Sequence, residues 1–364
     1  SIAWVDGGNL LRVGPRSAGA DPGPACYGSG GAEPTITDAN LLLGRIDPQY
    51  FLGGEIPLDV DAARTAIEEK CGRSLNMATV EVAHGIVEIA NAAMAGALRR
   101  ISIQRGFDPR EFALVAFGGA GPLHANRLAA ELDIPTVIVP RSPGTFSAMG
   151  LLATDLKHEY SATVIQRIDA PETRSLAETF SHLEQQGRTV LEREGVAAAA
   201  MRFERLAELR YIGQSHELAV GVVDPRLPAS ELARLAAEFH REHRRVYGFN
   251  APEEQVEVVT LRLAAVGDIS KPALRELESG EDPGPARRPE RQVYFAESGD
   301  YVSCPVFDRY KLGAGCYIEG PAILEEMDST TLVHPEYSAK VDPFGNLLIR
   351  SWSYGHQPSH ATER

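Results

Sequence analysis

Compact apolar runs alternate with small-residue turns in the stretch from residue 112 to 153. The run Phe112–Phe117 is short and entirely apolar, which is typical of a buried strand. Apolar positions then recur at helical spacing up to Leu132. Pro122 suits the first turn of that helix, because its missing N–H would be unpaired there in any case. Between the strand and the helix lie four small residues, Gly118, Gly119, Ala120 and Gly121.

A second unit of the same kind follows directly. Residues 136–139 predict a strand, and residues 141–150 form another small-residue turn that leads into a helix. Two such units in tandem predict parallel strands joined by a crossover helix, with both turns at the carboxyl edge of one sheet. Open α/β folds bind their ligands at that edge. The glycine turn at a helix N-terminus suits a nucleotide, although the same pattern also forms turns without a ligand.

The first 110 residues predict helices after a glycine- and proline-rich start. Ala3–Val5 and Leu10–Val13 flank a glycine turn and predict a hairpin. Residues 14–28 hold too much glycine and proline for regular structure and too many apolar residues for a disordered linker, so we expect an ordered loop. Three helices are expected to follow: one capped by Thr37 or Asp38, one from Asp59 or Asp61 to Gly72, and one from Thr79 to Arg105.

The second half predicts a mixture of helices and strands. Helices are expected at 176–195 and 230–246, a strand pair at 203–211 and 217–223, a strand at 256–266, a flexible charged excursion at 268–291, and short strands around Val293, Val306, Ile323, Leu332 and Leu347. We therefore expect an α/β domain at 1–157, an α+β domain with short strands at 158–350, and a disordered tail at 351–364.

Composition excludes several classes of protein. The 364 residues are 43% hydrophobic and 24% charged, as in ordinary globular proteins. The net charge of −14 argues against nucleic acid as a partner, because lysine and arginine carry phosphate binding. No apolar run approaches the length of a membrane span and the start lacks a signal-peptide pattern, so we expect a cytoplasmic protein with no membrane partner. The four cysteines show neither metal-ligand spacing nor a disulfide framework.

Single polar residues allow two interpretations each. Asp21, in the glycine and proline loop, could contact a substrate or metal, but an Asx turn that braces the loop is the simpler hypothesis. Cys26 could be a nucleophile, but no histidine lies near it in sequence and a buried structural thiol is more common. His124, one turn into the helix after the glycine turn, could face a nucleotide or be packed in the interior.

Two further groups could hold a metal. His240 and His243 lie three residues apart on one expected helix, but the arginines and glutamates around them favour a solvated face. The run Glu325–Thr331 offers carboxylates, but a polar turn between short strands is the favoured interpretation. The residues alone therefore assign no catalytic residue and no metal site.

Longer motifs resemble those of one family. They are Arg12–Gly28, Glu33–Asn40, Phe117–His124 and the turn at 142–152, followed by Arg210–Gln214, Tyr247–Phe249 and Gly320–Ile323. In these motifs the chain resembles the A subunit of the hydantoinase and 5-oxoprolinase family, whose relatives include the ATP-using subunits of acetone and acetophenone carboxylases. The resemblance runs from Ser1 to about Arg350.

The resemblance implies a fold, a chemistry and partners. The family resembles the actin, sugar kinase and Hsp70 superfamily, in which two ribonuclease-H-like lobes close over ATP, and Gly118–Gly121 would form the adenosine turn. The loop with Asp21 and Cys26 would be a possible substrate loop. ATP with Mg²⁺ would phosphorylate the oxygen of a small cyclic amide, such as a hydantoin or 5-oxoproline, or the enol oxygen of a ketone. A hydantoinase B-type subunit would then complete the hydrolysis or carboxylation in a hetero-oligomer.

The early phosphate-binding turns of that superfamily are absent from the sequence. Asp6–Asn9 matches a hairpin turn better than a phosphate turn. We therefore expect the chain to be the C-terminal part of a longer subunit that needs its N-terminal lobe. Alone it is expected to be a poor catalyst, and a non-catalytic assembly module is the alternative hypothesis.

Overall fold

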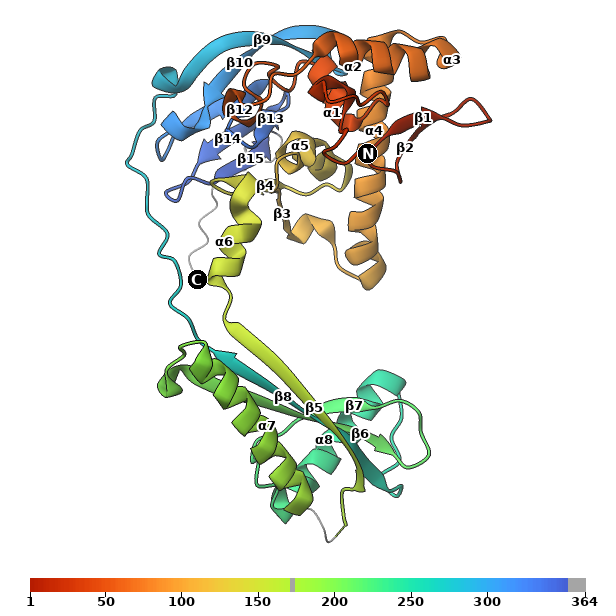
Figure 1. Ribbon diagram of the computed structural model, residues 1–364, viewed down its shortest axis with the longest axis vertical. Coiled ribbons are helices and arrows are strands. Elements are labelled where there is room, and N and C mark those ends of the chain that lie inside the picture. The colour runs from red at the N-terminus through yellow and green to blue at the C-terminus, as the bar shows by residue number, and fades with distance from the viewer. Residues whose placement is uncertain (171–173, 353–364) are drawn as a thin grey trace, which may run out of the picture. The chain divides into compact units, whose positions relative to one another are not determined.

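The computed structural model describes residues 1–170 and 174–352 (Figure 1). Contacts divide the chain into two compact units, residues 1–149 together with those from 273 onward, and residues 150–272. The consecutive domains expected at 1–157 and 158–350 stay a prediction. The packing adds that the chain returns to the first unit after residue 272, so the late strands belong to the same unit as the glycine turn.

The first unit contains a five-stranded sheet in the order β11-β14-β15-β4-β3. β3 (Ala113–Val115) and β4 (Thr136–Val139) are parallel, with Leu114 opposite Val137, and α5 (Gly121–Glu131) joins them. β4 leads through the short 3-10 helix η6 (Pro143–Thr145) into α6 (Phe146–Ala153). The predicted pair of strand-turn-helix units is confirmed. The remaining strands are β11 (Tyr317–Glu319), β14 (Tyr337–Val341) and β15 (Leu347–Ser351), which pair antiparallel.

A four-stranded sheet in the order β13-β12-β10-β9 completes the late part of the first unit. Its strands are β9 (Arg287–Phe295), β10 (Asp300–Asp308), β12 (Ala322–Glu325) and β13 (Thr330–Val333). The prediction of a flexible segment at residues 268–291 is wrong for residues 287–291, because β9 begins at Arg287. Its charged residues are paired inside the unit, since Arg288 and Arg291 both donate to the buried carboxylate of Glu325.

The N-terminal segments of the first unit pack on one apolar core. β1 (Ala3–Val5) and β2 (Leu11–Val13) form the predicted antiparallel hairpin. The helices are α1 (Ile36–Leu42), α2 (Val60–Ile67), α3 (Arg73–Leu75) and α4 (Thr79–Ile101), with a π-helical turn at Glu68–Gly72 and short 3-10 helices at Ala25–Tyr27, Phe51–Gly54, Ile103–Arg105 and Pro109–Glu111. Buried residues such as Leu43, Ile67 and Ile86 join these helices to the β9–β10 hairpin.

Several predicted helix ends are wrong by a few residues. Thr35, not Thr37 or Asp38, is the N-cap of α1, and Asp38 completes the capping box from the third helical position. Asp59 caps α2 as predicted, but Gly72 keeps right-handed helical angles and the chain leaves the helix at Asn76, whose φ is 52°. α4 has Ala78 rather than Thr79 as its N-cap and ends at Ile101 instead of Arg105.

The second unit is an antiparallel sheet in the order β5-β8-β6-β7 with two helices. Its elements are β5 (Leu156–Arg167), α7 (Arg174–Arg193), a 3-10 turn at Ala198–Ala200, β6 (Met201–Tyr211), β7 (Leu218–Gly221), α8 (Ala229–Tyr247) and β8 (Val256–Gly267). Phe180 of α7 and Phe239 of α8 lie fully buried in its core beside Leu209 and Leu261. The predicted pairing of β6 with β7 is confirmed.

The predicted tail begins too early. Ser351 is the last residue of β15, and the N–H of Trp352 donates to the carbonyl oxygen of Glu336 at 2.8 Å. The rest of the predicted tail, residues 353–364, lies outside the described residues. Among the residues that are described, none belongs to a helix long and apolar enough to cross a membrane.

Candidate functional site

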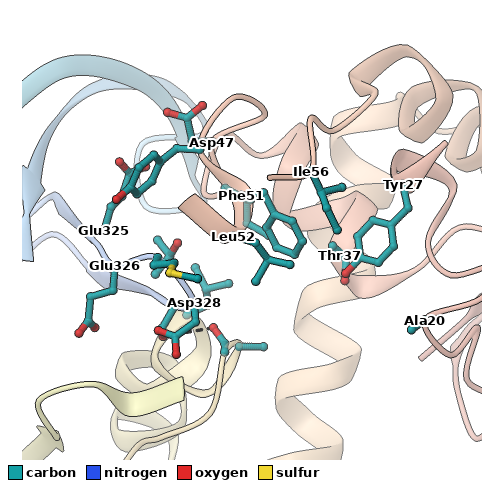
Figure 2. A pocket seen from close by; sticks show the side chains of 18 of the residues that line it. Ala20, Tyr27, Thr37, Asp47, Phe51, Leu52, Ile56, Glu325, Glu326 and Asp328 are labelled. Atoms are coloured by element: carbon teal, nitrogen blue, oxygen red, sulfur yellow. Dashed lines mark hydrogen bonds between the residues drawn. The ribbon is translucent and has the colours of Figure 1, made fainter. Parts of the chain in front are cut away.

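A cavity of about 500 Å³ lies in the first unit beside the glycine turn (Figure 2). Three segments line it: parts of residues 20–56, the glycine turn with the start of α5, and residues 325–330 between β12 and β13. About half of the lining residues are aromatic or aliphatic, and most of the others are polar. The apolar ones include Tyr27, Ile46, Phe51, Leu52, Ile56, Leu123 and Met327, and the polar ones include Thr37, Asp47, Glu325, Asp328 and Ser329. A hollow of this size that combines apolar and polar side chains suits a small organic ligand.

The glycine turn is held by the β12–β13 hairpin. The hydroxyl of Ser329 lies 3.3 Å from the carbonyl oxygen of Gly118 and 3.2 Å from that of Gly119. A Cβ on Gly119 would come within 3.0 Å of the carbonyl oxygen of Asp328, whereas one on Gly118 would meet nothing within 4 Å. Gly118 has a φ of 82°, which other residues rarely adopt. Other residues are therefore disfavoured at both positions, by close contact at Gly119 and by backbone conformation at Gly118.

The second small-residue turn meets the same hairpin. A Cβ on Gly144 would lie 2.2 Å from a carboxylate oxygen of Asp328, so the Asp328 side chain rests directly on the backbone of that turn. The turn after β3 thus contacts Asp328 and Ser329, and the turn after β4 contacts Asp328. This contact places the hairpin at the carboxyl edge of the parallel pair.

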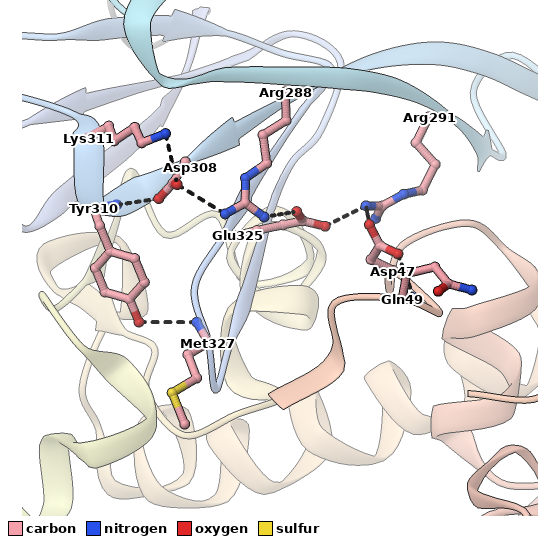
Figure 3. A network of polar contacts seen from close by, with 9 residues as sticks. All are labelled: Asp47, Gln49, Arg288, Arg291, Asp308, Tyr310, Lys311, Glu325 and Met327. Carbon is pink, nitrogen blue, oxygen red and sulfur yellow. Dashed lines mark hydrogen bonds and ion pairs between the residues drawn. The ribbon is translucent and has the colours of Figure 1, made fainter. Parts of the chain in front are cut away.

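A network of arginines and carboxylates fixes the hairpin and the Asp47 segment together (Figure 3). The buried carboxylate of Glu325 accepts from Arg288 at 3.0 Å and from Arg291 at 2.5 Å. Arg291 also donates to Asp47 at 2.8 Å, and Arg288 to Asp308 at 3.0 Å. Because each carboxylate faces a guanidinium, this network stabilises two walls of the cavity.

The run Glu325–Thr331 is the polar turn and strand start that the sequence favoured. β12 and β13 pair antiparallel on either side of the turn, and the Glu326 N–H donates to the Ser329 carbonyl oxygen at 2.9 Å. Within residues 1–170 and 174–352, no three histidine, cysteine or acidic side chains are grouped so as to hold a metal ion.

A buried ion pair anchors the end of β4 to the same hairpin. Arg309 donates to Glu326 at 3.0 Å and to the carbonyl oxygens of Val139, Pro140 and Gly345 at 2.9, 2.8 and 3.1 Å. Burial raises the pKa of Glu326 to about 7, in spite of the Arg309 charge beside it. Burial also lowers the pKa of Arg309, but five donors with four close acceptors keep this guanidinium charged.

Asp38 holds the loop that carries Tyr27 and Ser29 to the cavity. One of its carboxylate oxygens accepts from the N–H of Cys26 at 2.8 Å. The other accepts from the N–H of Thr35 at 2.8 Å, the hydroxyl of Thr35 at 2.7 Å and the N–H of Ala25 at 3.3 Å. Asp38 is fully buried, so these bonds replace the water that the carboxylate and the four donors would otherwise bind.

The predicted loop residues lie in different surroundings. Asp21 is exposed and follows Ala20, which lines the cavity. Cys26 is fully buried, and burial raises the pKa of its thiol, which favours the structural interpretation of this cysteine. Their assignment to substrate stays a prediction, as does that of Gly118–Gly121 to a nucleotide.

The three candidate histidines, His124, His240 and His243, contact neighbouring side chains. His124 is buried with Nδ1 2.7 Å from the side-chain oxygen of Asn91, and burial lowers its pKa to about 4, so the ring is neutral. The solvated face predicted for His240 and His243 is wrong, because both rings contact Tyr211 and His243 is buried. On α8, position 243 continues the apolar stripe through Leu235 and Phe239, while the flanking arginines face outward.

The residues that brace the cavity walls from behind were not identified from the sequence. Arg288, Arg291 and Arg309 carried no signal there, because their partners lie up to 244 residues away along the chain. Asp38 was expected only as a helix cap. Its position three residues after Thr35 is a capping-box spacing, but its bonds to Ala25 and Cys26 depend on how the loop folds back.

The sequence profile described as hydantoinase/oxoprolinase matches residues 1–160, and that described as hydantoinase/oxoprolinase C-terminal domain matches residues 166–350. The chain therefore belongs to the hydantoinase/oxoprolinase family. This confirms the family resemblance drawn from the motifs.

Three similar proteins indicate the breadth of this family. An uncharacterised protein of Methanocaldococcus jannaschii is 42% identical over 96% of this chain and 49% of its own length. Caprolactamase subunit alpha of Pseudomonas jessenii is 35% identical over 94% of this chain and 50% of its own length. 5-oxoprolinase 1 of Arabidopsis thaliana is 33% identical over 93% of this chain and 28% of its own length. The chain thus spans about half the length of the first two relatives and less of the third.

Two solved structures resemble the fold. A nucleotide-free acetone carboxylase, described as carrying out ATP-dependent acetone carboxylation, matches with a TM-score of 0.86 at 25% identity, over 96% of this chain and 51% of that one. ATP-dependent caprolactamase from Pseudomonas jessenii matches with a TM-score of 0.74 at 34% identity, over the same shares. These matches confirm the predicted α/β class, a ribonuclease-H-like lobe of the actin, sugar kinase and Hsp70 superfamily with a further α+β part.

Proposed function

We propose that the chain supplies the adenosine-binding part of an ATP-dependent enzyme that opens cyclic amides by phosphorylating the amide oxygen. The observation that carries this proposal is the turn Gly118–Gly121, which follows a parallel strand, opens α5 and borders a cavity of about 500 Å³. The relatives support a lactam as the proposed substrate class, because caprolactam and 5-oxoproline are both lactams and the solved caprolactamase is ATP-dependent.

The residues at the turn fit a nucleotide. Gly119 and Ala120 present backbone without bulky side chains. Gly121 supplies the first N–H of α5, since Pro122 has none and the Leu123 N–H donates to the carbonyl oxygen of Ala120 at 3.1 Å. Tyr27, Phe51 and Leu123 offer apolar surface to a planar ring. For Mg²⁺, the described residues provide no cluster of protein ligands, and we assign none of them to the metal.

The chemistry of the proposed reaction explains the need for ATP. A lactam carbonyl is a poor electrophile because of amide resonance, and bound ATP supplies the phosphoryl group that turns its oxygen into a leaving group. In this chain, the apolar wall would exclude water from the site, and the hydroxyl of Ser329 would keep the glycine turn in place. Asp21, exposed beside the cavity-lining Ala20, is the proposed polar contact to substrate. A B-type subunit would hydrolyse the activated amide.

A ketone carboxylase is the second candidate. The acetone carboxylase structure superposes on 96% of this chain with a TM-score of 0.86. There the oxygen to be phosphorylated would belong to an enol. In the second step the enol carbon would bond to carbon dioxide, and the phosphoryl group would pass to water as inorganic phosphate. The two candidates share the nucleotide site and differ in the substrate and in the second step, so one set of assays separates them.

The nucleotide site is tested by a binding measurement. In the full gene product, Gly119→Val should weaken ATP binding at least tenfold in calorimetry, because the side chain would press on the Asp328 carbonyl oxygen and enter the cavity. Gly221→Val is the matched control, since it lies in β7 of the other unit and its Cβ would meet nothing within 4 Å. Equal ATP affinity in the two variants would refute the role given to the glycine turn.

The substrate class is tested by phosphate release. The full gene product with its B-type subunit is assayed with Mg²⁺-ATP and caprolactam, 5-oxoproline or hydantoin, and in parallel with acetone or acetophenone plus bicarbonate. Release stimulated by a lactam, with ring-opened product, is the expected result. Release stimulated only by a ketone supports the carboxylase instead. Turnover by the present chain alone, at the rate of the full complex, would contradict the proposal that it supplies only part of the site.

A further inference from the structure

A second hollow lies in the second unit, between the loop that follows β6 and the C-terminal end of α8. It measures about 280 Å³ and is lined by Gln214, Ser215, His216, His243, Tyr247 and Phe249. Two of the family motifs, Arg210–Gln214 and Tyr247–Phe249, meet at this hollow, and the proposed function uses neither of them. We call it the His243 pocket.

His243 offers an unused hydrogen-bond acceptor to this pocket. The residue is only 2% exposed, and its Nδ1 lies 2.7 Å from the carbonyl oxygen of Phe249. A carbonyl oxygen can only accept, so Nδ1 carries the hydrogen, and Nε2 of the neutral ring is left as an acceptor. No other described residue forms a hydrogen bond or ion pair with Nε2. Nε2 keeps some accessible surface, unlike the sealed ring nitrogens of His334, so it faces the pocket that His243 lines.

Aromatic contacts fix the direction of this acceptor. The centroid of the His243 ring lies 4.9 Å from those of Tyr211 and Phe249 and 4.7 Å from that of Tyr247. The N–H of Gln214 donates to the carbonyl oxygen of Tyr211 at 3.0 Å and closes the turn after β6. Because the ring and the turn are both held by the packing of the second unit, the acceptor is preformed.

The lining of the His243 pocket excludes strongly charged ligands. Its six residues are an amide, a hydroxyl, two imidazoles and two aromatic side chains, with no lysine, arginine, aspartate or glutamate among them. A phosphate or carboxylate would find no cation in this lining, and an ammonium group would find no carboxylate. The volume lies just below the range of about 300–1,000 Å³ that is usual for drug-sized ligands, so the occupant is small. It also needs an N–H or O–H group, since an acceptor that stays unpaired in a filled pocket costs binding free energy.

We propose that the His243 pocket binds a small cyclic amide through its N–H group. An amide has one donor, one acceptor and no charge, which matches this lining. The donor would bond to Nε2 of His243, the carbonyl oxygen would accept from the side-chain amide of Gln214, and the methylene ring would cover the two aromatic side chains. The choice of a lactam among uncharged donors rests on the proposed function. The pocket belongs to residues 150–272, whereas the glycine turn belongs to the other unit, so it would be a second site for this class of molecule.

Nitrogen NMR of the histidine rings tests the contact directly. In the chain labelled with ¹⁵N-histidine, the Nε2 signal of His243 is assigned by its loss in His243→Phe, since phenylalanine continues the apolar stripe of α8. Caprolactam should shift this signal saturably, with a dissociation constant of about 1 mM, and should leave the ring signals of His158, on β5 of the same unit, unchanged. N-methylcaprolactam has no N–H and should bind about tenfold more weakly. Absence of a saturable shift, or equal affinity for both lactams, would overturn the proposal.

A variant at the rim distinguishes a binding site from a histidine that is only packed. Gln214→Ala removes the proposed partner of the lactam carbonyl and keeps the backbone turn, so it should weaken caprolactam binding about threefold or more. Gln185→Ala, at an exposed position of α7 outside the pocket, is the matched control and should bind like the wild type. Equal affinities in the two variants, or a His243 signal that shifts with Zn²⁺ and not with caprolactam, would overturn the proposal. The measurement contains no ATP, so its failure is distinguishable from a failure of lactam-stimulated phosphate release.

Discussion

Replacing Asp38 by alanine tests how the cavity loop is held. The buried carboxylate accepts four hydrogen bonds, from the N–H groups of Ala25, Cys26 and Thr35 and from the Thr35 hydroxyl. Alanine would leave these donors without an acceptor, and each buried unpaired donor costs about 1–3 kcal/mol. The hydroxyl can rotate to another acceptor and the long bond to Ala25 is weak. We therefore expect Asp38→Ala to lower the unfolding free energy by about 3–5 kcal/mol.

Urea unfolding followed by tryptophan fluorescence measures the loss of unfolding free energy in the first unit, which contains Asp38. Both tryptophans, Trp4 and Trp352, belong to the first unit, so their emission does not report on residues 150–272. Asp61→Ala is the control, because Asp61 is an exposed residue in the first turn of α2 and its loss should cost less than about 1 kcal/mol. Asp38→Asn keeps one acceptor oxygen, so its loss of unfolding free energy should lie between those of Asp38→Ala and Asp61→Ala. A loss for Asp38→Ala no larger than that of the control would refute the reasoning.

Three further predictions follow from the buried groups of the first unit. Glu325→Ala leaves Arg288 and Arg291 without their shared carboxylate and should lower the unfolding free energy by about 3–5 kcal/mol. The control Glu319→Ala, on the exposed face of β11, should change the unfolding free energy little. Similar urea midpoints for the two variants would contradict the role of the network. The raised pKa of Glu326, about 7, means that the folded chain binds a proton that the unfolded chain releases, so this group's stabilisation is present at low pH and is lost as pH rises toward 7. Glu326→Gln should flatten the fall in stability between pH 5 and 8 on the same urea assay, and an unchanged slope would disprove the assignment. All four cysteines are buried, so Ellman's reagent should label none of them rapidly before urea unfolds the chain, and a fast-reacting thiol in the native chain would argue against the packing around Cys26.

The local parts of this fold follow from the sequence because short-range rules decide them. The apolar run before Gly118, the small residues of the turn and the helical spacing after it are all local, and they predicted β3, α5 and the parallel β4. The β1–β2 hairpin and the caps at Thr35 and Asp59 obey the same kind of rule, although Thr35 was missed by two residues. The family motifs are contiguous for the same reason and could be recognised directly.

The partners of the buried polar side chains, including those that brace the candidate site, were decided only by the tertiary structure. In the sequence, Arg291 lies in a segment that is predicted to be charged and solvated. In the structure it belongs to β9 and bonds to Glu325 and to Asp47, which is 244 residues away along the chain. His243 stands among exposed arginines in the sequence, yet the stripe of α8 to which it belongs packs on Tyr211. A charged or polar side chain is buried only where distant parts of the chain supply its partners. Local sequence pattern and propensity carry no information about those partners. The sequence therefore determined the strand, the turn and the helix, and the long-range packing determined which side chains enclose the cavity beside them.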